Sequence, residues 1–185
     1  MNAAQGQSAG KDLEDESICY HLAGVGDGEG AFPIQTRRTP WTKFGFTITP
    51  EFKISQHKDN GKILEILREK LSCGKVGIKS GQPNQLVLVE KNRKNLTEKI
   101  IPFFQKYPLV VKEKSFQKFV DVIYGLNNNE HETQKGFERL LDLVFQKTNG
   151  GKGKRKYSRE EILGNPQRLY VEHRESDDDK VRLSQ

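Results

Sequence analysis

Residues 21–32 read HLAGVGDGEGAF and combine the carboxylates Asp27 and Glu29 with four glycines. Both acids lie at the end of a segment that we expect to be helical, residues 17–28. A helix C-terminus exposes carbonyl oxygens and carries partial negative charge, so added carboxylates are unfavourable there unless a cation binds. Carboxylate and carbonyl oxygens are hard ligands, which suit Mg²⁺ or Ca²⁺. The pattern therefore predicts a divalent-cation site, and its alternative is a glycine-capped surface turn with incidental acidic residues.

The glycines of this helix predict a partner helix. Each of Gly24, Gly26 and Gly28 costs a helix interior about 1 kcal/mol relative to alanine. Gly24 and Gly28 are four residues apart and share a face, where small side chains let two backbones approach closely. The motif occurs once in the chain, so a second copy must supply the partner. We therefore expect a homodimer whose two-fold axis runs beside this helix.

The composition of the chain indicates which class of partner it binds and in which compartment it is found. The 185 residues carry a net charge of +6, which favours a polyanionic partner, nucleic acid before membrane. The two cysteines fit neither a disulfide framework nor a zinc site. No run approaches the roughly 18 apolar residues of a membrane span, and the N-terminus resembles neither a signal nor a transit peptide. We expect no membrane contact, and a location in the cytoplasm or nucleoid of a prokaryote or in a chloroplast or mitochondrial matrix.

The hydrophobic spacing predicts an α+β fold. Alternation favours strands over residues 31–39, 43–57, 75–79 and 85–90. Helical spacing favours helices over residues 60–73, from residue 95 or 97 to 104, and over 112–126 and 137–145. The order is αββαββα followed by additional helices, with helices backing one face of an antiparallel sheet. We expect one domain over residues 16–148, a flexible lead-in over 1–15, and a basic linker and tail over 149–185.

The other face of the predicted sheet is polar and basic, as is typical of a surface that binds nucleic acid. Its expected DNA-binding residues are Gln35, Arg37, Thr39, Thr47, Lys53, Ser55, Lys75, Lys79 and Gln85. Trp41 lies in the turn between the first two strands, where packing or a loop-tip contact with the DNA backbone is the favoured interpretation.

The stretch HLAGVGDGEG resembles the signature of the LAGLIDADG homing endonucleases, and the element order matches that family's αββαββα core over residues 17–145. KFGFTITPEFKISQH and NLTEKIIPFF are similar to the single-motif branch that cuts ribosomal RNA genes. The matching motif residues are Leu22, Ala23, Gly24, Asp27, Gly28, Glu29 and Gly30. The resemblance implies a homodimer on double-stranded DNA, with its sheets in the major groove. Dimer contacts are expected from Leu22, Ala23, Gly24, Asp27 and Gly28.

The resemblance also implies the chemistry of the site. Glu29 would bind the catalytic divalent metal together with the main-chain carbonyl of Gly28 or Asp27. Gln56 would position water, and Lys112 would join the active-site solvent network, with Lys114 as the alternative. We expect Mg²⁺ as the cofactor, Mn²⁺ as a substitute, and Ca²⁺ as an ion that binds without supporting cleavage.

Two functions are compatible with the basic surface. The first is an intron-encoded homing endonuclease that hydrolyses a long pseudo-palindromic target in a large-subunit ribosomal RNA gene. The second is a maturase that binds its own group I intron RNA, or a DNA-binding regulator derived from a nuclease. The second class does not need the carboxylate of Glu29, so the intact acidic pair favours the nuclease.

Three positions depart from the family pattern. Gly26 replaces a bulky apolar residue, and Pro33 interrupts the first DNA-facing strand. Asn60 stands where some relatives carry an active-site arginine, a role for which Lys58 and Lys62 are the alternatives.

Overall fold

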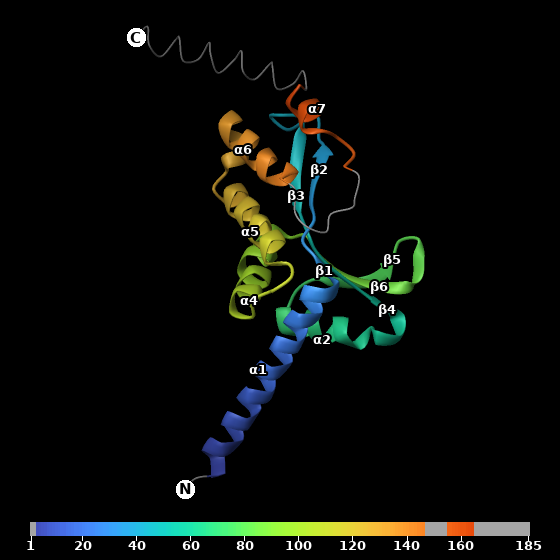
Figure 1. Ribbon diagram of the computed structural model, residues 1–185, viewed down its shortest axis with the longest axis vertical. Coiled ribbons are helices and arrows are strands. Elements are labelled where there is room, and N and C mark those ends of the chain that lie inside the picture. The colour runs from blue at the N-terminus through green and yellow to red at the C-terminus, as the bar shows by residue number, and fades with distance from the viewer. Residues whose placement is uncertain (1–2, 147–154, 165–185) are drawn as a thin grey trace. The chain divides into compact units, whose positions relative to one another are not determined.

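A computed structural model describes residues 3–146 and 155–164 of the chain (Figure 1). The described residues fall into two compact units. The first unit contains residues 3–33 and 51–123, and the second contains residues 34–50, 124–146 and 155–164. Helix α5 (Glu113–Asn127) begins in the first unit and continues into the second.

The first unit is built on a four-stranded antiparallel sheet in the order β1-β4-β6-β5. Its strands are β1 (Gly30–Ala31), β4 (Phe52–His57), β5 (Lys75–Lys79) and β6 (Gln82–Glu90). Helices α1 (Ala3–Glu29) and α2 (Lys62–Leu71) lie on one side of this sheet (Figure 1). The 3₁₀ turn η1 (Lys58–Asn60) joins β4 to α2. Alternation along β4 buries Phe52 and Ile54, as the sequence pattern predicts.

A helical segment and an aromatic cluster complete the first unit. The segment runs through α3 (Arg93–Asn95), the π-helical turn η2 (Leu96–Ile100) and α4 (Ile101–Lys106). The ring of Phe32 lies 5.2 to 5.6 Å, between centroids, from four other phenylalanine rings on β4, α4 and α5. Those rings belong to Phe52, Phe104, Phe116 and Phe119. The cluster fixes the point where α1 passes into the strands.

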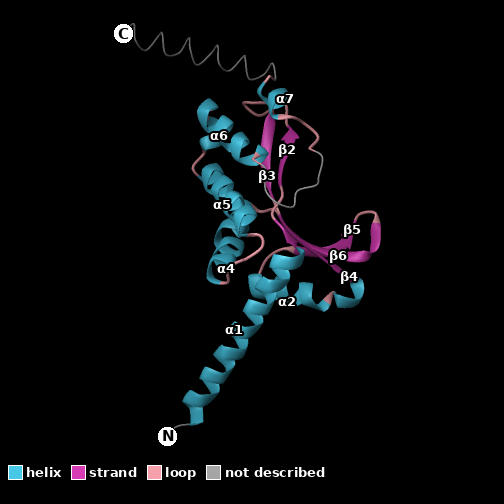
Figure 2. Cartoon of the chain, in the orientation of Figure 1, coloured by secondary structure: helices cyan, strands magenta, loops and turns pink. Residues whose placement is uncertain are grey.

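The second unit is built on a two-stranded antiparallel sheet of β2 (Ile34–Arg38) and β3 (Phe46–Pro50), shown with the other strands in Figure 2. It also contains η3 (Glu130–Glu132), α6 (Gln134–Phe145) and α7 (Arg159–Leu163). Phe44 stacks on Phe137 of α6, and Tyr157 packs edge-on against Phe46. Ile162 is fully buried, so α7 belongs to the core of this unit.

The α+β architecture and the element order are confirmed, with three differences. Helix α1 begins at Ala3 rather than at residue 17, so residues 3–15, expected to be a flexible lead-in, are helical. The predicted strands break at residues 32–33 and at Glu51, which divides the predicted sheet into two sheets. Pro33 contributes to the first break because it has no N–H to donate to a ladder. The helix expected from residue 95 or 97 begins at Arg93, because the Asn92 side chain caps it.

Most of the predicted basic linker and tail lies outside the described residues, which cover only residues 155–164 of it. There, the side chain of Ser158 and that of Glu161 form a reciprocal capping box at the start of α7. Within the described part of the chain, no helix has both the length and the apolar character needed to cross a membrane.

Candidate active site

The side chain of Asp27 joins the end of α1 to the loop before α5. Its carboxylate accepts the backbone N–H groups of Val110, Val111 and Lys112 at 2.9 to 3.1 Å. Burial by itself raises the pKa of Asp27, but these donors and the Lys112 ammonium lower it below its ordinary value. The oxygens of this side chain are therefore used within their own chain, and the dimer contact expected from Asp27 stays a prediction.

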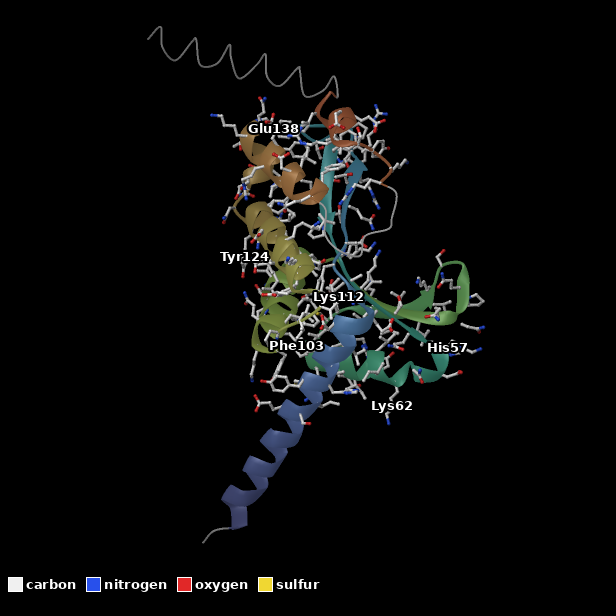
Figure 3. All side chains as sticks on the ribbon, viewed as in Figure 1. His57, Lys62, Phe103, Lys112, Tyr124 and Glu138 are labelled. Atoms are coloured by element: carbon white, nitrogen blue, oxygen red, sulfur yellow. The ribbon has the colours of Figure 1, made fainter. Side chains whose placement is uncertain are left out.

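Lys112 lies beside the C-terminal end of α1 (Figure 3). Its Nζ donates to the carbonyl oxygen of Gly28 at 2.6 Å and also to the carbonyl of Asp27. Lys114, the alternative, is exposed in the first turn of α5. Of the two candidate lysines, Lys112 is the one that contacts the carbonyls at this end of α1. Two main-chain carbonyls therefore converge on a single cation.

Glu29 and Gln56 complete the set of side chains at this end of α1. Glu29 is the last residue of the helix and is exposed, and no described residue holds its carboxylate by a hydrogen bond or an ion pair. The antiparallel register pairs Gly30 with Ile54, so Gln56 follows along β4 next to the end of α1. Gln56 is half-buried on the sheet face that contains Ile54. The fold therefore brings both residues to the same end of α1.

The donor set fits a hard divalent ion held partly by substrate. Among the residues that the structure describes, no three His, Cys, Asp or Glu side chains form a metal cluster. The chain instead offers one exposed carboxylate, from Glu29, beside the carbonyls of Asp27 and Gly28, which already attract an ammonium group. Mg²⁺ commonly binds one or two carboxylates and completes its shell with water and phosphate. Glu29 and the Gly28 carbonyl fit that pattern.

The glycine-rich face of α1 is only partly available to a second chain. Leu22 and Ala23 are buried within their own chain, which contradicts their predicted dimer contacts. Gly24 and Gly28 are exposed, and a Cβ on either would meet no atom within 4 Å. Gly26 is different, because a Cβ there would lie 2.8 Å from Cε1 of the buried Phe104 ring. Gly26 therefore allows α1 to approach α4 closely.

The polar residues predicted to bind DNA divide between the two sheets. In the two-stranded sheet, Gln35 and Arg37 are exposed, and Thr47 pairs with Arg37. Thr39 follows the end of β2 and is 7% exposed, so its predicted place on the open strand face is wrong. Its hydroxyl lies 2.9 Å from that of Thr47 and donates to the Arg37 carbonyl, which draws it inward.

In the four-stranded sheet, Lys53 and Lys75 both pair with Val89, so they share a face. Ser55 lies two residues from Lys53 on the same face, and Gln85 pairs with His57 there. Lys79 lies at a register shift between β5 and β6, outside the regular alternation. Glu51, next to this surface, is 2% exposed, and its partner Lys91 was not among the residues predicted from the sequence. Continuing the alternation of Gln85 and Val89 by two residues would have pointed to Lys91.

Trp41 is 86% exposed at the turn between β2 and β3, so the packing interpretation is wrong. The turn itself is well fixed, because Thr39 N–H donates to the Gly45 carbonyl at 2.7 Å and Gly45 N–H donates to the Thr42 carbonyl at 2.9 Å. The indole is therefore presented to solvent on an ordered turn.

Residues 22–123 match the family model described as "LAGLIDADG endonuclease". The matched range includes the end of α1, the strands and the loop of residues 110–112. The chain belongs to the LAGLIDADG endonuclease family. Its Asp27, Gly28, Glu29 and Lys112 all lie inside the matched range.

Relatives extend the match beyond a short motif. DNA endonuclease I-CeuI of Chlamydomonas moewusii is 35% identical over 128 residues, which are 67% of this chain and 57% of that protein. Homing endonuclease I-ApeII of Aeropyrum pernix is 26% identical over 77% of this chain and 86% of its own length. The archaeal intron-encoded homing endonuclease I-Vdi141I, solved in complex with DNA, superposes with a TM-score of 0.76 at 29% identity. That comparison covers 85% of this chain and 98% of the archaeal one.

Proposed function

We propose that this chain is an intron-encoded homing endonuclease that hydrolyses both strands of a specific DNA duplex. The observation that carries the proposal is the end of α1, where the exposed Glu29 lies beside two carbonyls that bind the Lys112 ammonium. The names of the relatives add support, because I-CeuI is called a DNA endonuclease and I-Vdi141I was solved with DNA.

Each residue of the site has a distinct part in the proposed reaction. Glu29 and the Gly28 carbonyl would hold the divalent ion, for which we propose Mg²⁺ with Mn²⁺ as a substitute. A bound ion of this kind lowers the pKa of water and stabilises the leaving 3′ oxygen. Lys112 would keep the Asp27 carbonyl in place and yield the Gly28 carbonyl to the ion. Gln56, a neutral side chain, would orient water rather than take its proton. Ca²⁺ would bind here without supporting cleavage.

The assembly and the target class are further parts of this proposal. We propose a homodimer that meets across Gly24 and Gly28, because these glycines leave open space on the exposed face of α1. Two copies would then recognise the two halves of a pseudo-palindrome. We propose a large-subunit ribosomal RNA gene as the target class, from the similarity of residues 43–57 and 95–104 to the branch that cuts such genes.

Glu29→Gln tests the proposal directly. We expect the natural protein to linearise a plasmid that carries an intron-less ribosomal RNA gene in Mg²⁺. The variant should bind the same DNA in a gel shift and leave it uncut, because the change removes the charge that holds the ion but not the DNA-facing strands. Glu16→Gln makes the same change at an exposed position of the same helix and should cut normally.

Other outcomes separate the alternatives. Cleavage by Glu29→Gln at the natural rate would contradict the assigned metal ligand. Binding to intron RNA without any DNA cleavage in Mg²⁺ or Mn²⁺ would favour a maturase. Binding to DNA alone, again without cleavage, would favour a regulator derived from a nuclease.

A further inference from the structure

Glu51 is a buried charged residue that the proposed reaction does not use. It lies between β3 and β4, and its backbone N–H donates to the Pro33 carbonyl at 2.9 Å. Its side chain is 3% exposed, yet both carboxylate oxygens are paired. Oε2 lies 2.5 Å from Nζ of Lys53, and Oε1 lies 3.0 Å from Nζ of Lys91. One buried carboxylate therefore holds two lysines from different parts of the sheet.

The two lysines are on the surface that faces away from α1 and α2. The register pairs Lys53 with Val89, and Lys91 follows Val89 by two residues, so the alternation of a strand puts them on one face. Lys75 pairs with Val89 from the other side and adds a third positive charge to this face. The side chains of Lys53 and Lys91 are 33% and 56% exposed. They are thus accessible from solvent although Glu51 is not.

The arrangement is suited to an anion. Two ammonium groups on one carboxylate leave a net charge of +1, and each ammonium has three N–H donors, of which Glu51 needs one. Burial by itself raises the pKa of Glu51, but the contacts with Lys53 and Lys91 outweigh it and lower the pKa below its ordinary value. Glu51 is therefore charged at neutral pH. It restrains both lysine side chains before a ligand arrives, which reduces the entropy lost on binding.

We propose that Glu51 is a positioning residue that holds Lys53 and Lys91 as a clamp for a backbone phosphate of the DNA duplex. The proposal rests on the proposed DNA-binding function. A phosphate is favoured over a base edge because lysine acts as a point charge, whereas arginine and asparagine have the planar donor sets that bind base edges in two places. Lys53 would then contribute affinity and register rather than sequence preference.

Glu51→Gln tests the proposal, because the two explanations predict opposite changes in DNA affinity. The change removes a negative charge beside a polyanion, so electrostatics alone would tighten binding. If Glu51 positions the lysines, binding should instead weaken by about 100-fold, as expected for four side chains, two in each subunit, that must now be ordered on association. Fluorescence anisotropy with two unrelated duplexes of equal length, in Ca²⁺, measures this without cleavage. Both duplexes should lose affinity by the same factor.

Lys53→Met and Lys91→Met supply the second measurement, and both variants retain the aliphatic part of the side chain. Each should lower the slope of log Kd against log salt concentration by about 1.8, because the proposed dimer loses one phosphate contact in each of its two subunits. These two variants also keep the proposal testable if thermal unfolding shows that Glu51→Gln does not fold. Glu65→Gln is the matched control, because it removes one exposed carboxylate from α2 and should leave affinity and slope unchanged.

Three results would overturn the clamp. They are equal or tighter binding by a folded Glu51→Gln, unchanged salt slopes in both methionine variants, and a loss of affinity for one duplex only. Each can occur in a protein that still cuts DNA, so failure of the clamp is distinct from failure of the nuclease proposal. Conversely, a protein that binds DNA through the clamp and never cuts would contradict only the proposed function.

Discussion

The two acidic residues at the end of α1 differ in what their carboxylates contact. Asp27 and Glu29 are both acidic, two residues apart, and the sequence motif contains both. The carboxylate of Asp27 accepts hydrogen bonds from three backbone N–H groups, whereas Glu29 is exposed to solvent. The difference arises from the Val110–Lys112 loop, which covers one side of the helix end and not the other.

The choice between the two candidate lysines can be tested with a matched pair. We expect Lys112→Met to lower the rate of plasmid cleavage by about 100-fold, the scale of losing a group that positions or transfers protons at a reacting centre. Lys114→Met should cut at nearly the natural rate, because that side chain is exposed and Lys112 is the residue that donates to the carbonyls of α1. A gel shift should give similar DNA affinity for both variants. Equal loss of cleavage in the two would contradict the assignment of Lys112.

Asp27→Asn should change how stability depends on pH. At pH 7 we expect a loss of about 1–3 kcal/mol in the free energy of unfolding, since a charged acceptor of several hydrogen bonds is removed. The folded-state pKa of Asp27 lies below its ordinary value of 3.8, so its stabilisation is fully present above about pH 5. It is lost as the pH falls below 3.8 and through the folded pKa.

Urea unfolding at pH 7, 5 and 3 measures this dependence. The gap between the natural protein and Asp27→Asn should stay constant from pH 7 to 5 and shrink towards pH 3. Glu16→Gln, which changes an exposed carboxylate of the same helix, should shift the free energy of unfolding by less than about 0.5 kcal/mol at each pH. A gap that is the same at pH 3 as at pH 7 would mean that the hydrogen bonds of Asp27 do not depend on its charge.

At the scale of elements, the β2–β3 hairpin has the character of a DNA-binding element. Residues 34–50 contain three cations, Arg37, Arg38 and Lys43, and no acidic residue. All three cations are exposed. The ordered turn between the strands presents Trp41 among them, so an aromatic surface and positive charge occur together, as in many sites that contact nucleic acid.

Trp41 makes contact by this hairpin directly observable, because it is the only tryptophan in the chain. We expect its fluorescence to be quenched when a duplex is added, since DNA would replace water around an indole that is 86% exposed. Trp41→Phe should remove the signal and bind the same duplex with similar affinity. Unchanged fluorescence at a DNA concentration that saturates a gel shift would exclude contact by the tip of the hairpin.

At the scale of the whole molecule, the proposal requires a dimer, because the chain has one Glu29 and a duplex has two strands. Analytical ultracentrifugation should give about twice the chain mass of 21.2 kDa. Gly24→Leu should shift the mass towards the monomer, since the added side chain would fill the space left for a partner. Gly77→Leu places the same side chain on β5, also in open space, and should leave the dimer intact. A Gly24→Leu protein with the natural mass would contradict contact at this face.

Much of the fold and part of the site follow from local patterns. The alternation along residues 43–57 and the helical spacing of residues 137–145 depend on neighbours in the chain, so the sequence predicts them well. The motif likewise predicts Glu29. Lys112 lies far from the motif in the sequence, and it was predicted from the resemblance to the family. Thr39 was misplaced because a polar side chain is buried when partners satisfy it, and its hydroxyl is satisfied by the Arg37 carbonyl and by Thr47 on the neighbouring strand.

The sequence by itself determined the family, the order of elements and the position of the acidic pair, because each depends on residue type and spacing along the chain. Only the tertiary structure showed what holds the Asp27 carboxylate, that Lys112 contacts the carbonyls of α1, and why residue 26 is a glycine. The physical reason is that these properties depend on contacts between distant segments. Residues 110–112 lie more than eighty residues from Asp27 in the sequence, yet their N–H groups donate to its carboxylate. The Phe104 ring leaves no room for a side chain at Gly26.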